Sequence, residues 1–357
     1  MSHSAGLKLR SVFANLAPSV AALIVASIVG LLVIAMAGHS PFEAARIMLE
    51  AGFGDRHAVT ESLLKAVPLL FTGLAVTVAF RAGIWNIGAD GQFMIGALAA
   101  TYLGVHIQWT SPGAAFVSMS LAAFLAGSLW SGVASALREW RHVSEVISTI
   151  MLNLIALQLV SFMVHGPLQE AAGTYPQSDR LPEMVRLARW IPGTRLHSGF
   201  FLGLFLCVGV WLLLFRTAPG FRIRAIGQNP EAARYAGMSV RRTAVTAMLL
   251  SGGLAGLGGY VEIAGVTYRL YENISPGYGF TAIAVALLGR LHPLAMIPAA
   301  LLFGGLESAT RALQRTMGIS PVLAEIIQAL VILIVVGFES RRVRQWLAKW
   351  TVFFRQP

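Results

Sequence analysis

Long hydrophobic runs alternate with short polar segments along most of the chain. A first apolar run covers 18–38, and further runs follow at 63–80, 92–107, 114–137, 143–164, 199–216, 243–264, 280–291, 294–310 and 321–338. A helix needs about 20 residues, most of them apolar, to cross the hydrocarbon core of a bilayer. The pattern therefore predicts an all-α, polytopic membrane protein, with one transmembrane domain over 1–357 and about ten transmembrane elements.

The first apolar run has two interpretations. Lys8 and Arg10 precede it, and Ala35-Met36-Ala37 resembles the cleavage site of a signal peptide. The run is longer than the usual apolar core of a signal peptide, about 7–15 residues, which favours a retained first helix. Residues 39–61 then mix acidic, basic and apolar positions, a pattern typical of an amphipathic helix at the outer membrane interface.

The polar break at 80–92 interrupts the regular succession of apolar runs. Its sequence, FRAGIWNIGADGQ, holds three glycines, two side-chain amides and one acid, and Phe93 resumes the apolar run at once. At membrane depth, such a break is tolerated only where protein or a water-filled cavity satisfies the freed backbone groups. Broken helices commonly mark the substrate path of transporters. We therefore expect a discontinuous helix here, with Gly88 in an unusual backbone conformation; the alternative is an ordinary tight turn on the cytoplasmic side.

A second discontinuous element is predicted near the C-terminus. The apolar run 280–291 is too short to cross a bilayer alone, and the sequence GRLHP at 289–293 separates it from the next run. Between these breaks, the glycine-rich run 251–259 has the small-residue spacing that permits close helix packing.

Composition supports a membrane protein and charge orients it. The chain is 56% hydrophobic and 12% charged, whereas soluble domains carry about 25% charged residues. The net charge is +11, and 24 of the 27 basic residues are arginines. With alternating elements, one side collects Lys8, Arg10, Arg81, Arg138, Arg141, 216–242, Arg290 and 341–355. The positive-inside rule makes that side cytoplasmic, with both termini inside, so the charge is read as a topology signal and not as a nucleic-acid site. The loop 165–198, although it contains four arginines, is predicted to be external.

One cytoplasmic stretch, 216–242, contains signals for a short helix. Asn229 is a good N-cap, Pro230 suits the first helical position, Glu231 complements the helix dipole, and Gly237 suits the C-terminus. About two turns are too few for a helix to be stable alone in water, so it needs a partner. The alternative is a solvated basic loop that only fixes topology.

Catalytic and metal-binding patterns are missing from the sequence. No GxxxxGK[ST] phosphate loop occurs, so this chain does not bind ATP in that manner, and no HExxH spacing indicates a metal. Cys207 is the single cysteine, which excludes a disulfide framework. No cluster of residues offers a reaction, so we predict no cofactor, no metal and no enzymatic activity.

Acidic residues within apolar runs raise a further possibility. Glu145 and Glu325 fall near predicted span ends, where an interfacial position is less costly. Glu307 is deeper and suits an interior hydrogen bond, and Glu262 ends another run. An ion-coupled secondary carrier would use Glu262 and Glu307 as a relay.

Several stretches resemble one family of transport proteins. They are PLLFTGLAVTVAFRAGIWNIGADGQFMIGA, SEVISTIMLNLIA, GFRIRAIGQNPEAARYAGMS, GYGFTAIAVALLGRLHPLAMIPAALLFGGLES and AEIIQALVILIV. Together they cover most of 67–336 and resemble membrane subunits of ATP-binding cassette importers of the ribose and branched-chain amino-acid permease group. NIGADGQ and EVISTIMLN are most similar to the branch associated with nucleoside uptake, often called simple-sugar permeases.

The resemblance implies a multi-pass permease of the bacterial cytoplasmic (inner) membrane, in contact with membrane lipid. Its implied partners are a homologous second permease, ATP-binding subunits and an extracytoplasmic substrate-binding protein, and no nucleic acid. The implied cargo is a nucleoside or related sugar-containing solute, with a simple sugar such as a pentose as the alternative.

Two sets of site residues follow. Stacking and hydrogen bonding to such a solute are predicted for Trp85, Asn86, Gln92, Tyr278 and Phe280. Coupling to the ATPase, which the resemblance assigns to the short helix, is predicted for Asn229, Glu231, Ala233, Arg234 and Gly237.

Overall fold

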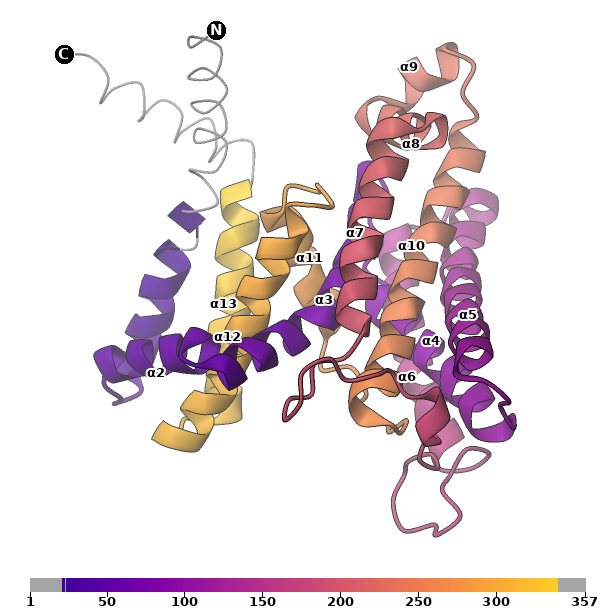
Figure 1. The fold of residues 1–357 in the computed structure, drawn as a ribbon. Helices are drawn as coiled ribbons and strands as arrows, with labels where there is room; N and C mark the ends of the chain where they lie inside the picture. Colours follow the sequence, from indigo (N-terminus) through magenta and orange to yellow (C-terminus); the bar gives the residue numbers. More distant parts are fainter. Residues whose placement is uncertain (1–20, 23, 340–357) are drawn as a thin grey trace, which may run out of the picture. The chain divides into compact units, whose positions relative to one another are not determined.

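The computed structural model describes residues 21–22 and 24–339 and consists of helices joined by turns and one long loop (Figure 1). The helices are Ile24–Met36, α2 Pro41–Phe53, α3 Arg56–Arg81, α4 Ala89–His106, α5 Pro112–Arg141, α6 Glu145–Val164, η1 Glu183–Val185, α7 Gly199–Arg216, α8 Ala218–Gln228, α9 Pro230–Tyr235, α10 Val240–Glu262, η2 Ile263–Thr267, α11 Tyr278–Leu288, α12 Met296–Met317 and α13 Pro321–Glu339. Within this part of the chain, extended pairing is limited to two isolated bridges: Arg189 with His197 inside the long loop, and Gln177 of that loop with Tyr271.

The helical content agrees with the prediction of a polytopic membrane protein. Among the described residues, five helices are long and apolar enough to cross a bilayer: α3, α5, α6, α7, and α10 with its π-helical extension η2. Both predicted breaks fall at helix ends, between α3 and α4 and between α11 and α12, and whether each one interrupts a membrane-spanning element stays a prediction. The total of ten elements and the cytoplasmic termini stay predictions, because 1–20 and 340–357, with Lys8, Arg10 and 341–355, lie outside the described residues.

The chain divides into two compact units. One comprises 56–305, and the other comprises 1–55 together with 306–357. We describe each unit by itself, and the predicted single domain over 1–357 stays a prediction. The unit 56–305 holds both breaks and the short helices α8 and α9. Figure 1 shows α8 and α9 at one end of this unit and the loop 165–198 at the opposite end.

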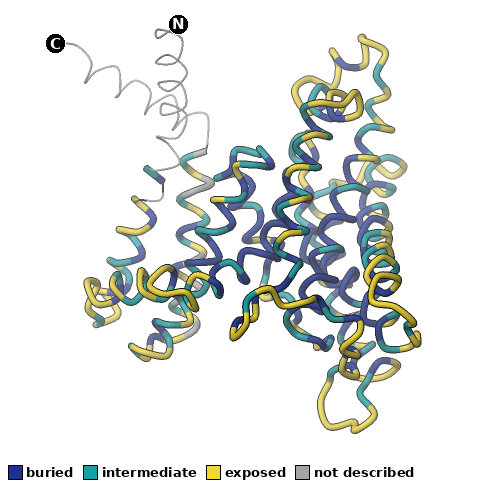
Figure 2. Tube along the Cα trace, in the orientation of Figure 1, coloured by how far each residue is buried: buried dark blue, intermediate teal, exposed yellow. Residues whose placement is uncertain are grey.

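Helix α10 forms the centre of the unit 56–305 and packs against α3, α4 and α5. Most of the apolar length of α3 and α10 is buried, whereas at most about a third is buried in α5, α6 and α7 (Figure 2). The glycine run of α10 permits this packing: a Cβ atom at Gly252 or Gly256 would overlap the α5 backbone, and one at Gly259 would overlap the α4 backbone. Close approach of backbones through small residues is a common mode of helix association in membranes.

The N-terminal amphipathic prediction was wrong in its extent. Residues 39–61 are not one helix, because α2 ends at Phe53 and α3 starts at Arg56. Ser40 caps α2, its Oγ accepting from the amide of Glu43 at 3.3 Å. Pro41 at the first helical position and Gly54 just after the last one mark the limits of α2. Helix α3 then begins at Arg56, before the predicted apolar run that starts at 63.

The intramembrane acids fall into different settings. The Glu145 carboxylate lies 3.7 Å from Nε of Arg138, at the start of α6 as predicted. Glu307 accepts from Nη2 of Arg311 one turn along α12 at 3.0 Å. Glu262 is 6% exposed at the end of α10. The side chain of Glu325 lies outside the described set.

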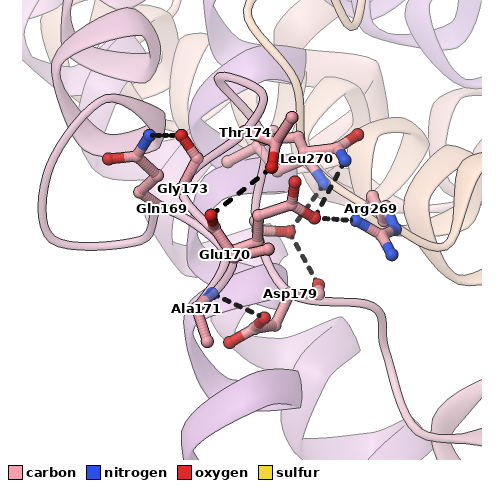
Figure 3. Close-up of polar contacts among 11 residues, drawn as sticks. Gln169, Glu170, Ala171, Gly173, Thr174, Asp179, Arg269 and Leu270 are labelled. Atoms are coloured by element: carbon pink, nitrogen blue, oxygen red, sulfur yellow. Dashed lines mark hydrogen bonds and ion pairs between the residues drawn. The ribbon is translucent and has the colours of Figure 1, made fainter.

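The long loop 165–198 is fixed to the segment that precedes α11 (Figure 3). The amide of Ser178 donates to the carbonyl of Leu270 at 2.8 Å, and the amide of Leu270 donates to Ser178 Oγ at 2.9 Å. The Glu170 carboxylate accepts from Arg269 and from Gln177. Burial alone would raise the pKa of Glu170, but the hydrogen bonds from Arg269 and Gln177 outweigh it and hold the pKa below its ordinary value. The loop is thus an ordered part of this unit.

Candidate functional site

The site is built around the break between α3 and α4. Helix α3 ends at Arg81 and α4 begins at Ala89, so 82–88 form a turn within the unit. Gly83 takes the left-handed conformation, with φ +74°, which glycine adopts without steric cost. Gly88 has φ −87°, so the predicted unusual backbone at Gly88 was wrong. Gly88 is constrained by space, because a Cβ atom there would lie 3.0 Å from the Thr149 side chain.

The Asn86 side chain organises the turn through four hydrogen bonds. Its Nδ2 donates to Gln92 Oε1 at 2.9 Å and to Ser251 Oγ at 2.8 Å. Its Oδ1 accepts from the Gly88 amide at 2.9 Å and from Gln92 Nε2 at 3.0 Å. Both donor hydrogens and both lone pairs of the amide are therefore used. Asn86 and Gln92 are 0% and 1% exposed, so this network lies in the interior of the unit.

Helix α6 holds the same turn from a second side. Asn153 Nδ2 donates to the carbonyl of Ile87 at 2.9 Å, and Asn153 Oδ1 accepts from the Gly91 amide at 2.8 Å. Thr149 Oγ1 accepts from the Ile87 amide at 3.3 Å. The backbone groups that the break frees thus bond to side chains of α6 and are satisfied without water. Sequence reasoning missed these roles, although Thr149 and Asn153, spaced i,i+4 in an apolar run, are a usable signal.

Asp90 connects the first break to the second discontinuous element. Its Oδ1 accepts from Ser275 Oγ at 2.7 Å and from the Gly279 amide at 2.9 Å. Gly279 lies in the first turn of α11, and Asp90 lies in the first turn of α4, so one carboxylate serves two helix N-termini. Helix N-termini favour negative charge because their amides are unpaired and their dipoles point outward. Asp90 was not among the predicted site residues.

The predicted pathway residues occupy two different environments. Asn86, Gln92 and Tyr278 are buried, and the Tyr278 ring packs edge-on against Phe93 with centroids 5.6 Å apart. Trp85 and Phe280 are exposed, at 55% and 46%. The structure therefore brings the two amides together in a supporting network and leaves two aromatic rings at the surface of the unit.

The second break is closed by Arg81. Residues Arg290 and Leu291 both have positive φ, 55° and 52°, after α11 ends at Leu288. Arg81 Nε donates to the Leu291 carbonyl at 2.8 Å, and Arg81 Nη2 donates to the Arg290 carbonyl at 3.2 Å. One guanidinium at the end of α3 thus satisfies carbonyls of the other break, and the two breaks form one connected structure.

Two short helices, α8 and α9, form one end of the unit, next to the turn 82–88. Only α9 was predicted; the sequence analysis assigned no secondary structure to 218–228, which forms α8. Thr217 caps α8, its Oγ1 accepting from the Gly220 amide at 3.2 Å, and Ile223 and Ile226 are buried. Two glycines and a proline in APGFRIRAIGQ have low helix propensity and argue against a helix here. Pro219, however, lies in the first turn of α8, where proline is tolerated.

The signals predicted for α9 are confirmed. Asn229 Oδ1 accepts from the Ala232 amide at 3.0 Å, and Pro230 is the first helical residue. At the other end Gly237, with φ +77°, donates to Arg234, and the Met238 amide donates to Ala233. These two bonds form the Schellman motif that glycine permits.

The surface of α9 differs from the expectation at one position. Glu231, Arg234 and Gly237 are exposed, but Ala233 is 4% exposed and packs within this chain. Tyr235 is 94% exposed and was not among the predicted residues. A concavity of about 280 Å³ lies between α8 and α9, lined in part by Phe221 and Ala233.

Helix α8 contacts the first break directly. A Cβ atom at Gly227 would overlap the Arg81 carbonyl oxygen, and one at Gly83 would lie 3.2 Å from Gly227 Cα. Arg224 Nε donates to the Leu214 carbonyl at 2.8 Å and so caps α7. Motion of α8 therefore acts on the turn 82–88 through a backbone contact.

The described residues contain no group of three or more His, Cys, Asp or Glu side chains arranged to hold a metal. Cys207 is buried in α7. The arrangement consists of discontinuous helices joined by hydrogen bonds, next to a pair of short helices. Helix interruptions of this kind are common along the substrate path of transporters.

Comparison with known proteins identifies the family. The chain matches the family model described as branched-chain amino acid transport system / permease component over residues 58–336, and it belongs to that family. It is therefore a transport component and not an enzyme.

Individual relatives cover most of the chain. The chain is 37% identical over 310 residues to the glucose ABC transporter permease protein TsgB13 of Haloferax volcanii, covering 84% of this chain and 81% of the relative. Two relatives from Bacillus subtilis are named guanosine ABC transporter permease proteins, NupP and NupQ. They are 34% and 31% identical, over 88% and 70% of this chain and 91% and 80% of their own lengths.

Proposed function

We propose that this chain is the membrane-spanning permease subunit of an ATP-binding cassette importer that carries a nucleoside or a related sugar-containing solute into the cytoplasm of a bacterium. The observation that carries the proposal is the contact of α8 with the turn 82–88, which joins the helix pair α8 and α9 to the turn between α3 and α4. The names of the guanosine and glucose permeases support the class of solute. The second candidate function is import of a simple sugar, which the name of the related glucose permease supports.

The proposed partners follow from the same observations. Two guanosine permeases of one organism resemble this chain, which supports pairing with a homologous second permease. The basic segment 216–242 carries α8 and α9, and the positive-inside rule assigns it to the cytoplasmic side, where ATP-binding subunits would dock. The loop 165–198 then faces outward, toward an extracytoplasmic binding protein. The cytoplasmic membrane of a bacterium is the proposed location.

Reconstituted uptake tests this proposal. The complete importer in proteoliposomes, with ATP inside and binding protein outside, should accumulate labelled guanosine. Excess unlabelled nucleosides should compete, and glucose or ribose should not. Competition by sugars alone would favour the second candidate. ATP-independent uptake by this chain alone, driven by an ion gradient, would contradict the proposal.

Tyr235 should anchor the ATP-binding subunit. Its side chain is 94% exposed at the tip of α9, and buried aromatic anchors dominate the binding energy of many protein interfaces. We expect Tyr235→Ala to weaken binding of the ATP-binding subunit by about 30-fold, which corresponds to about 2 kcal/mol. Affinity is measured by titrating the detergent-solubilised permease with the purified subunit.

The matched control is Tyr175→Ala. Tyr175 is 62% exposed in the loop 165–198, at the opposite end of the unit. That variant should bind the ATP-binding subunit like the wild type. Equal affinities for all three proteins would exclude α9 as the docking helix. Ala233→Asp is a weaker test, because Ala233 is buried in this chain and the charge would disturb α9 itself.

Trp85 and Phe280 should line the solute pathway, because they are the predicted pathway residues that the unit leaves exposed. In a Cys207→Ala background, Trp85→Cys and Phe280→Cys should react with a membrane-impermeant thiol reagent, and bound solute should slow the reaction. Leu129→Cys is the control: Leu129 is 71% exposed in the middle of α5, where lipid should shield it. Labelling of Leu129→Cys but of neither aromatic position would contradict the pathway assignment.

A further inference from the structure

Three arginines surround one tyrosine on the long loop's side of the unit. The guanidinium carbons of Arg180, Arg186 and Arg189 lie 5.9, 4.9 and 6.0 Å from the centroid of the Tyr268 ring. All four residues line a concavity of about 510 Å³, here called the Tyr268 pocket. Arginine near an aromatic face is a favourable contact, but three cations around one ring also repel one another.

Backbone hydrogen bonds hold the Tyr268 pocket in shape. The Leu181 amide donates to the Tyr268 carbonyl at 2.9 Å, and the Leu187 amide donates to Ala264 at 2.9 Å. Tyr268 itself has φ +56° at the end of the π-helix η2. Arg186 Nε and Nη2 donate to the Leu181 carbonyl at 2.9 and 2.7 Å. The convergence of the cations is therefore built into the fold of 180–189.

The positive charge of this pocket is only partly balanced. Glu183 is the acidic residue that lines it; its Oε1 lies 3.5 Å from Nη1 of Arg186, and its side chain is 92% exposed. Within the described residues, Arg180 and Arg189 form no ion pair and both are exposed; Nη2 of Arg189 donates to the Tyr268 hydroxyl at 3.4 Å. Three cations and one acid leave the pocket with a net charge of about +2 at neutral pH, because arginine stays protonated.

Large apolar side chains are exposed beside these charges. Met184 lines the pocket and is 44% exposed; Trp190, next in sequence to Arg189, lies outside the lining, is 61% exposed and packs its ring against Phe201 with centroids 4.4 Å apart. Arginine, tryptophan, tyrosine and methionine are enriched in protein interfaces, whereas a free anion would need only the guanidinium groups. The combination favours a protein partner with an acidic surface.

We propose that the Tyr268 pocket is the docking surface for a carboxylate-bearing face of the extracytoplasmic binding protein. This inference rests on the proposed function, and it adds the surface and the chemistry of the contact. Asp or Glu side chains of the partner enter the concavity and accept hydrogen bonds from Arg180 and Arg189. The partner then also covers the Met184 side chain, which lines the same pocket.

The docking surface has a direct connection to the first break. Tyr268 begins the segment 268–275. Within it, the Leu270 amide donates to Ser178 Oγ of the loop, and Ser275 Oγ donates to Asp90 Oδ1. Asp90 also accepts from the first turn of α11. A partner that shifts 268–275 therefore acts on the same carboxylate that joins α4 to α11.

The test is a titration of the complete importer in proteoliposomes with its own purified, solute-loaded binding protein. The measurement is the binding-protein concentration that gives half-maximal stimulation of ATP hydrolysis. Arg180→Glu combined with Arg189→Glu should raise that concentration by about tenfold or more, and added salt should weaken the wild type more than the variant. Arg186 is left intact because it holds the Leu181 carbonyl.

Two matched variants test the sign of the charge effect. Glu183→Gln removes the acidic residue of the pocket and should lower the half-maximal concentration by about two- to threefold. Arg180→Lys combined with Arg189→Lys keeps the charge and should stay within about threefold of the wild type. Basal ATP hydrolysis and association with the ATP-binding subunits should be unchanged in every variant.

An unchanged half-maximal concentration in the double glutamate variant would overturn the inference. So would a defect that disappears when anionic lipid is omitted from the vesicles, since that outcome assigns the pocket to a lipid headgroup. Failure of the proposed function gives a different result, namely no ATP-driven uptake by the wild-type importer itself.

Discussion

Gly256→Val should abolish accumulation of the folded permease. A Cβ atom at Gly256 would overlap the Ala123 carbonyl oxygen of α5, and one at Gly96 of α4 would overlap the Gly256 backbone. Backbone on both sides leaves no flexible side chain to move aside, so α10 must separate from α4 or α5. Overpacking against a rigid neighbour costs about 3 kcal/mol or more, a large fraction of the stability of most proteins.

The measurement is the amount of monodisperse permease and its melting temperature after extraction in detergent. Gly209→Val is the matched control, because no atom lies within 4 Å of a Cβ atom built at Gly209 in α7. That variant should accumulate and melt like the wild type. Equal yields and melting temperatures for the two valine variants would show that α10 does not pack this closely in the membrane.

Asn86→Leu should eliminate transport and destabilise the unit by about 3–5 kcal/mol. Leucine has a similar size but removes all four hydrogen bonds of the amide, which leaves the Gly88 amide and the Gln92 side chain short of partners in the interior. Each buried polar group without a partner costs about 1–3 kcal/mol. Asn86→Asp keeps the acceptors but loses both donors, and its buried charge is a further cost, so it should not rescue transport.

The control for this network is Gln108→Leu. Gln108 is exposed in the turn between α4 and α5, and its substitution should change stability by about 0.5 kcal/mol or less. ATP-driven uptake and melting temperature are measured for all three variants. Normal uptake by Asn86→Leu would mean that the break is an ordinary turn whose internal hydrogen bonds are dispensable.

The breaks and caps were predictable because their causes are local. Asn229, Pro230 and Gly237 act on amides and carbonyls within four residues, so the limits of α9 follow from nearest neighbours. The break after Arg81 likewise requires only a glycine in the left-handed region within a polar stretch. Helix α8 was not predicted, because it is stabilised by the burial of Ile223 and Ile226 against other helices and not by local sequence signals.

The partners of the polar side chains could not be predicted from local sequence. Asn86 bonds to Ser251, which is 165 positions away, and Asp90 bonds to Gly279 of α11 and to Ser275 in the segment before α11. Polar residues in an apolar chain are expected to have hydrogen-bond partners. The sequence does not show which groups those partners are, because the arrangement of the helices in space decides it. For this reason Asn86 and Gln92, predicted as pathway residues, lie in a buried network in this structure.

The sequence by itself determined that this chain is helical and embedded in a membrane, where its helices break, and how α9 begins and ends. Periodicity, hydropathy and capping act over a few residues, and a bilayer makes backbone satisfaction obligatory along each segment. Tertiary structure alone decided that Arg81 closes the second break, that Gly227 rests on the first, and that three arginines converge on Tyr268. These contacts join residues far apart in the chain, and packing, which is a property of the whole unit, brings them together.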